Sequence, residues 1–317
     1  MSGRELPVAI VRACLRDGRG GSPTAVVDDA SSNDDERRGV PASAGTSHAV
    51  FVSTHEGPSG DPVASLRFFT SEGELPACGH GTVAALAFLA GRAGRDEYRA
   101  TLHAGGRVFT GRSVREKTGV HAAFDPGPVE LREPTESEIG LALAALGLAP
   151  GALAPDARVA SVGRPRLLVP VGSRSALAAL APDFERLRAV CDRLGFLGCY
   201  VYTVPTPEGR VAARMFAPSI GVAEDIANAN STACLAGHLA GRGITDITVD
   251  MGDSVGAPAT ITATARNSRS GPSIQVGGTA EVTGFVHGHR AADAERTDVD
   301  RKTVQDGTSG RGATSPG

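Results

Sequence analysis

The stretches ACGHGTVAALAFLAGRAG (residues 77–94) and NANSTACLAGHLAGRG (residues 228–243) share one plan. Each begins with small and polar residues, continues as an apolar run and contains Leu-Ala-Gly-Arg near its end. An offset of 150 residues aligns Leu89 of the first stretch with Leu239 of the second. A helix that is apolar on most faces must be buried on most faces. We therefore predict that each stretch is the central helix of one of two similar lobes.

The composition excludes several classes of protein. A net charge of -3 and the absence of a dense Lys/Arg block argue against nucleic-acid binding. The longest apolar runs, such as residues 83–90, are far shorter than the roughly 20 residues of a membrane-spanning helix. The five cysteines are scattered and odd in number, which argues against a disulfide framework. With no signal-peptide pattern at residue 1, we expect a cytoplasmic protein that binds a small molecule, with no nucleic-acid or membrane partner.

Strand patterns surround both central stretches. Alternating apolar runs at 6–15, 24–29, 48–54 and 64–70 predict strands, and the polar residues 28–46 predict a loop between them. Thr135, followed by Glu136 and Glu138 and an apolar period, predicts the start of a helix. The whole pattern predicts a mixed α/β (α+β) fold of two pseudo-symmetric lobes, each a strand-rich, barrel-like sheet wrapped around a central apolar helix.

Three segments follow from this pattern. We expect residues 1–130 to form the N-terminal lobe and residues 131–287 to form the C-terminal lobe, with late strands able to cross back to the first lobe. Residues 288–317 are nearly free of apolar side chains, which predicts a disordered tail.

The residues in front of the two helices carry the candidate chemistry. Helix N-termini present unpaired N–H groups and a positive dipole end, which bind carboxylates. The 150-residue offset pairs Cys78 with Asn228 and His80 with Asn230. A thiol or an imidazole exchanges protons near neutral pH. The sequence therefore predicts a cleft between the lobes where a carboxylate-bearing molecule meets proton-handling groups.

Five stretches in order carry a family resemblance between about residues 7 and 265. They are GGSPTAVV (20–27), LRFFTSEGELPACGHGTVA (66–84), RLLVPVGSRSALAALAPDFERLRAV (166–190), RMFAPSIGVAEDIANANSTA (214–233) and GDSVGAP (252–258). The chain resembles the PhzF-like isomerases of phenazine biosynthesis, relatives of diaminopimelate epimerase and proline racemase. The resemblance implies two pseudo-symmetric lobes, a homodimer, no cofactor, and movement of a proton within a small substrate.

The resemblance also assigns site residues. The histidine of the family's Gly-His segment corresponds to His80, and the aspartate of its Glu-Asp segment to Asp225. The family's catalytic glutamate is replaced by His48 in SHAVF, and an imidazole base starts neutral or cationic rather than anionic. We predict catalytic roles for these three residues, although His80 could cap locally, His48 could point outward and Asp225 could be a helix N-cap.

The chain also departs from the family's pattern at three other positions. Ser22, Asn230 and Ala257 stand where the family has asparagine, serine and arginine. The predicted substrate-binding residues are Cys78, Gly79, Gly81, Asn228, Ala229, Asn230 and Ser231.

Three alternatives stay open. An epimerase with one cysteine from each lobe would use Cys78, but its counterpart is Asn228, and Cys234 lies about two turns inside the helix. A non-catalytic binding protein would explain the lost glutamate. A metal held by His48, His80 and Asp225 is chemically possible, but the trio lacks metal-ligand spacing, so we expect no metal.

The sequence thus predicts a cofactor-independent isomerase that shifts a proton and a double bond in an unsaturated, carboxylate-bearing molecule. An Ala-, Gly- and Arg-rich, Lys-poor composition indicates a high-GC genome, where the resemblance implies antibiotic biosynthesis. One related group isomerises the diene precursor of 4-alkylproline units.

Overall fold

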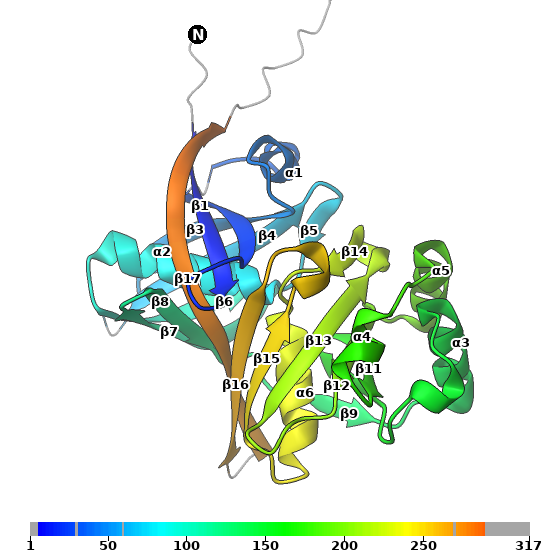
Figure 1. Cartoon of the computed structure of the whole chain (residues 1–317). Coiled ribbons are helices and arrows are strands. Elements are labelled where there is room, and N and C mark those ends of the chain that lie inside the picture. The colour runs from blue at the N-terminus through cyan, green and yellow to red at the C-terminus, as the bar shows by residue number, and fades with distance from the viewer. Residues whose placement is uncertain (1–5, 29–30, 59, 269–270, 289–317) are drawn as a thin grey trace, which may run out of the picture.

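The computed structural model describes residues 6–28, 31–58, 60–268 and 271–288. The predicted tail, residues 288–317, lies outside this range except for its first residue. Figure 1 shows two lobes, with helix α2 (Gly79–Ala93) inside the first and α6 (Ala229–Ala240) inside the second. Both helices are buried over most of their length. The predicted fold class is confirmed.

The first lobe is a closed barrel. Its strands pair in the order β1–β2–β3–β4–β6–β7–β8–β17, and β17 returns to β1. Their bounds are β1 (Leu6–Leu15), β2 (Ser22–Asp28), β3 (His48–Glu56), β4 (Pro62–Thr70), β6 (Glu97–Ala104), β7 (Arg107–Glu116), β8 (Gly119–Phe124) and β17 (Gly271–Gly288). The short β5 (Gly73–Leu75) turns back on β4 and leads into α2. The barrel therefore surrounds α2 with apolar side chains.

The second lobe is a curved sheet around α6. Its strands pair in the order β9–β10–β11–β12–β13–β15–β16–β17. Their bounds are β9 (Glu130–Arg132), β10 (Arg158–Val162), β11 (Arg164–Val171), β12 (Cys199–Thr203), β13 (Arg210–Ala217), β15 (Asp246–Met251) and β16 (Ala259–Ser268). The short β14 (Val222–Asp225) pairs with β13 and leads into α6, as β5 leads into α2. The two lobes thus deliver their central helices in the same way.

Strand β17 belongs to both lobes. It pairs with β1 and β8 of the first lobe and with β16 of the second, and Figure 1 shows it as the long curved strand that runs between them. The remaining elements are α3 (Glu136–Leu146), α4 (Arg174–Ala178), α5 (Phe184–Leu194) and the 3-10 turns η1 (Pro150–Ala152), η2 (Pro218–Ile220) and η3 (Asp253–Val255). Helices α3 and α5 cover a second apolar cluster on the outer side of the second lobe.

The segment 28–46 is not a loop throughout, as the sequence predicted. It contains helix α1 (Asp34–Ser43), whose N-cap Asn33 accepts hydrogen bonds from the backbone N–H groups of Asp35 and Glu36. The Glu36 carboxylate accepts a hydrogen bond from the N–H of Asn33, which completes a capping box. The helix forms because this capping box and buried Val40 outweigh the polar composition.

None of the helices within the described residues is long and apolar enough to cross a membrane.

Candidate active site

The N-termini of the two central helices meet. Cys78 is the N-cap of α2 and Asn228 is the N-cap of α6, the two positions that the 150-residue offset pairs. A Cβ atom added at Gly79 would lie 2.7 Å from the Cβ of Ala229 and 3.0 Å from the backbone nitrogen of Asn230. Glycine is therefore needed at position 79 because the helices touch there.

Matching ion pairs fix the approach to each helix. In the first lobe Arg67 of β4 binds Glu74 of β5 through two hydrogen bonds of 2.8 and 2.6 Å. In the second lobe Arg214 of β13 binds Glu224 of β14 through two bonds of 2.9 and 2.7 Å. A bidentate guanidinium–carboxylate pair fixes both the relative orientation of the two side chains and the distance between them. In each lobe this ion pair therefore fixes the position of the short strand that leads into the central helix.

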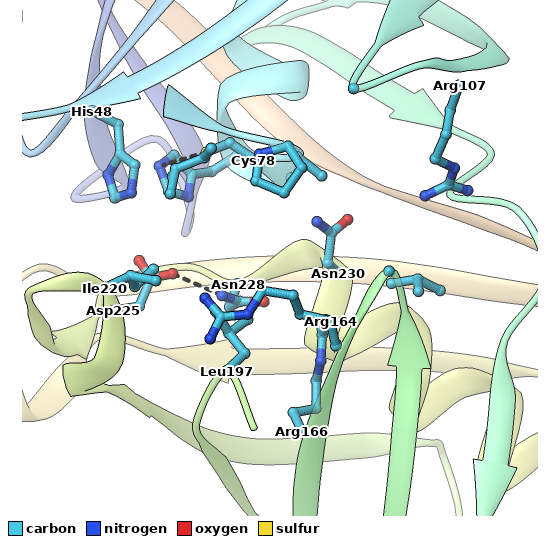
Figure 2. A pocket seen from close by; sticks show the side chains of 18 residues that line it. His48, Cys78, Arg107, Arg164, Arg166, Leu197, Ile220, Asp225, Asn228 and Asn230 are labelled. Carbon is cyan, nitrogen blue, oxygen red and sulfur yellow. Dashed lines mark hydrogen bonds between the residues drawn. The ribbon is translucent and has the colours of Figure 1, made fainter. Parts of the chain in front are cut away.

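A cavity of about 270 Å³ lies where the lobes meet, small enough to suit a small metabolite. Figure 2 shows His48 and Cys78 on one wall, and Asp225, Asn228 and Asn230 on the opposite wall. Seven of the ten residues predicted from the sequence line it: His48, Cys78, Gly79, His80, Asp225, Asn228 and Asn230. The other three, Gly81, Ala229 and Ser231, are not among the lining residues.

Two of these three residues have a visible packing or capping role. A Cβ atom at Gly81 would lie 3.0 Å from the Sγ of Cys78, so this glycine makes room for the thiol. The backbone N–H of Ser231 donates to the Asn228 side-chain oxygen at 2.9 Å, so it is already satisfied as a helix cap.

His80 is held by both lobes. Its Nδ1 lies 2.9 Å from the carbonyl oxygen of Ala227, and its Nε2 lies 3.4 Å from the Sγ of Cys78. A carbonyl only accepts, so Nδ1 keeps its proton and Nε2 is the atom that titrates. Burial lowers the pKa of His80, but Cys78, Asp225 and the Ala227 carbonyl together raise it to about 10. The surroundings of His80 therefore favour its imidazolium form.

His48 is buried at the start of β3 and does not point outward. Its ring meets that of His80 edge-on, with centroids 4.5 Å apart, and its Nδ1 lies 2.9 Å from the hydroxyl of Ser47. Burial and the charge on His80 both lower the pKa of His48 well below 6.5. The surroundings therefore shift the pKa values of the two adjacent imidazoles in opposite directions, His48 toward the neutral form and His80 toward the charged form.

Asp225 reaches the cavity from the other lobe. It ends β14, and its carboxylate accepts hydrogen bonds from the Asn228 side-chain amide at 2.9 Å and from the N–H of Ala227 at 3.4 Å. The alternative that Asp225 is the N-cap of α6 is wrong, because Asn228 has that role. Asp225 instead bonds to the cap residue Asn228 and presents a carboxylate across from His48 and Cys78.

Three arginines that sequence reasoning missed also line the cavity: Arg107, Arg164 and Arg166. Arg164 and Arg166 are alternate residues at the start of β11, so their side chains leave the strand on the same face. Arginine at two alternate positions of a strand that is otherwise apolar is the signal that could have found them.

One ligand atom from each of His48, Cys78 and His80 lies within 4.8 Å of the others, and all three side chains are buried. Two imidazoles and a thiol are a donor set that zinc accepts. This trio differs from the one that the sequence suggested, since Cys78 takes the place of Asp225. The expectation that no metal is bound stays a prediction, which chelation tests.

The comparisons with known proteins agree with this geometry. Residues 14–284 match the family PhzC-PhzF, phenazine biosynthesis-like protein. The chain belongs to this family, as its motifs predicted. "Uncharacterized isomerase YddE" of Escherichia coli O157:H7 is 28% identical over 179 residues, which cover 55% of this chain and 59% of the relative. The chain spans about three fifths of the length of the first curated relatives it matches.

Solved structures show the same fold. A PhzF-family phenazine biosynthesis protein of Bacillus anthracis superposes with a TM-score of 0.77 at 18% identity, covering 90% of this chain and 99% of that one. A predicted epimerase of Pseudomonas aeruginosa gives 0.75 at 26% identity, with 89% and 98% covered. A probable proline racemase of Agrobacterium radiobacter gives 0.61 at 10% identity, with 93% and 94% covered, a likeness of fold alone.

Proposed function

We propose that this protein is an isomerase that removes a proton from one carbon of a small, unsaturated carboxylate and returns a proton at another, shifting a double bond. The observation that carries the proposal is the pair of buried imidazoles, His48 and His80, whose ring centroids lie 4.5 Å apart in the same cavity as Asp225. Neutral His48 can accept a proton, and the imidazolium of His80 can donate one. The reaction needs no oxidant, because one proton leaves the substrate and one returns.

Asp225 completes the acid–base set from the facing lobe. A carboxylate there can accept a proton from the opposite face of the same substrate, and the negative charge that develops on the substrate lies near the N-termini of α2 and α6. The family resemblance supports the finer assignment to antibiotic biosynthesis, with diene precursors of 4-alkylproline units as the first candidates. We also propose that the enzyme works in the cytoplasm as a homodimer without a cofactor.

A second candidate function is epimerisation at the carbon next to the carboxylate. The contact between the Sγ of Cys78 and the Nε2 of His80, 3.4 Å apart, favours it, because a thiol beside an imidazole can pass its proton to that ring. Such an enzyme would pair Cys78 on one face with Asp225, not a second cysteine, on the other.

Solvent-deuterium exchange tests both functions. The protein would be incubated in D₂O with cyclic amino acids and conjugated-diene pyrroline carboxylates, and the products read by mass and proton spectra. We expect deuterium gain with a double-bond shift, reduced about 10²–10⁴-fold in His80→Gln. The exposed His103→Gln is the matched control that keeps full activity.

The other outcomes are distinct. Exchange with inversion at the carbon next to the carboxylate would replace the isomerase by the epimerase. Binding without exchange would mean a non-catalytic binding protein. Activity that disappears on chelation and returns with zinc would overturn the acid–base assignment, since the imidazoles would then hold a metal.

A further inference from the structure

Arg166 is buried without a counter-charge. Its side chain is 2% exposed, yet it forms no ion pair with any carboxylate among the described residues. Its Nη1 donates to the hydroxyl of Ser231 at 3.3 Å and its Nη2 to the carbonyl of Arg164 at 2.7 Å. Its Nε has no hydrogen-bond partner within the part of the chain that is described. A guanidinium is always charged, so this arrangement leaves one positive charge uncompensated.

The groups around Arg166 do not compensate for it. The titrating side chains that feel its charge include Tyr200 and Cys234, whose pKa values are raised by burial and only partly lowered by Arg166. Both side chains are therefore neutral at pH 7. Burying a charge without a partner is costly, and an anion that arrives from solvent would remove this cost.

The wall of the cavity carries an excess of positive charge. Arg107 and Arg164 line it beside Arg166, and neither forms an ion pair among the residues that the structure describes. Asp225 is the one carboxylate among the lining residues, and it is bonded to Asn228. Three guanidiniums therefore line a cavity that has a single carboxylate among its lining residues, which selects an anionic ligand.

We propose that Arg166, with Arg164 beside it, is the subsite that binds the carboxylate of the ligand. A planar carboxylate matches the fork of a guanidinium, and the buried Nε–H of Arg166 has no acceptor among the residues that the structure describes. This assignment places a guanidinium at the N-terminus of α6, where Arg166 contacts Ser231 and the N–H of Ser231 is already capped by Asn228. That the ligand is the substrate rests on the proposed function; that an anion binds does not.

Binding of pyrrole-2-carboxylate and of its neutral amide, measured by calorimetry, tests the subsite. We expect the carboxylate to bind and the amide to bind at least tenfold more weakly. Arg166→Met should weaken carboxylate binding at least tenfold, Arg166→Lys should weaken it less, and the exposed Arg186→Met is the control. Equal binding of acid and amide, or equal binding by wild type and Arg166→Met, would overturn the proposal. Inorganic phosphate that binds and displaces the carboxylate would overturn its chemical class.

A second measurement separates a binding role from a structural one. Because Met replaces an uncompensated charge by an apolar chain of similar length, Arg166→Met should unfold at a higher temperature than wild type without ligand, and the carboxylate should no longer raise that temperature. A lower unfolding temperature would mark Arg166 as a structural residue instead.

Turnover distinguishes this proposal from the isomerase. With an active substrate, Arg166→Met should raise KM more than it lowers kcat, and unchanged KM would overturn the subsite. If no compound exchanges deuterium but carboxylate binding still requires Arg166, the isomerase fails and the subsite stands.

Discussion

His48 and His80 owe the opposite shifts of their pKa values to different neighbours. Both rings are buried, which disfavours the charged form of each. The charges of Cys78 and Asp225 and the carbonyl of Ala227 raise the pKa of His80, whereas burial and the charge of His80 both lower the pKa of His48. Two identical side chains thus become a donor and an acceptor through their surroundings alone, a common way to separate acid and base roles.

The pH dependence of activity follows from these two pKa values. His80, with its pKa raised to about 10, stays protonated as pH rises until about 10, and His48, with its pKa well below 6.5, stays neutral through neutral pH. We therefore expect kcat/KM to be flat from about pH 7 to about pH 9 and to fall as pH passes about 10. Initial rates over this range measure it.

Cys78→Ser sharpens this experiment. It removes the thiol that raises the pKa of His80, so the alkaline fall should move to lower pH. Cys234→Ser, on the buried face of α6, is the control and should leave the profile in place. A wild-type profile that changes near pH 6.5 would contradict the assigned protonation states. Complete loss of activity in folded Cys78→Ser would favour the epimerase.

The sequence predicted the histidines and Asp225 better than the arginines. Gly-His and Glu-Asp stand in motifs whose order along the chain can be compared, so His80 and Asp225 could be found without coordinates. Arg166 begins an apolar run that predicts only a buried strand. Whether the guanidinium of Arg166 meets a carboxylate depends on side chains of other strands and of α6. These residues are distant in the sequence, so the local pattern around Arg166 does not predict them.

At the scale of elements, the turns of the motifs GGSPTAVV and GDSVGAP contact each other in the fold. The N–H of Gly21 donates to the carbonyl of Pro258 at 2.9 Å, which joins the turn of GGSPTAVV to that of GDSVGAP. Gly20 has a φ of +67°, and a Cβ atom there would clash with the Pro258 carbonyl oxygen. The sequence showed both turns but not their contact, because they are more than two hundred residues apart along the chain.

Gly20→Ala should therefore destabilise the protein strongly. We expect a loss of about 3 kcal/mol in the free energy of unfolding, because strain from positive φ adds to a backbone clash. Gly18→Ala is the matched control: its φ is +72°, but a Cβ atom there meets nothing within 4 Å, so about 1 kcal/mol is expected. Urea unfolding measures both, and equal losses would contradict the clash.

Helix α1 was missed for a different reason: the local sequence contains a signal for it, but the segment was predicted to be a loop. Asn33 and Glu36 have the spacing of a capping box, yet the acidic and small residues around them predicted a loop. Arg37 of this helix is buried over the rings of Phe51 and Phe69. A helix with few apolar residues is stable here because its tertiary contacts supply what composition lacks.

At the scale of the whole molecule, β17 joins the two lobes. Its residues pair with β1 from the start of the chain and with β8 and β16, and one apolar cluster contains side chains of both α2 and α6. The sequence predicted two lobes with late strands able to cross back to the first. It could not predict which strands pair, since pairing between distant segments depends on register rather than on composition.

This shared core predicts that the two lobes unfold in one transition. The sequence has no tryptophan, so Phe109→Trp in β7 and Phe184→Trp in α5 each introduce a single fluorescent reporter. Phe109 packs against the core around α2, whereas Phe184 packs against Phe216 in the outer cluster of the second lobe. Because β17 and the continuous core couple these regions, the urea midpoints of the two reporters should coincide with that of circular dichroism. Separate midpoints would mean that the outer cluster beneath α3 and α5 unfolds by itself, and the cavity between the lobes would then be lost in two steps rather than one.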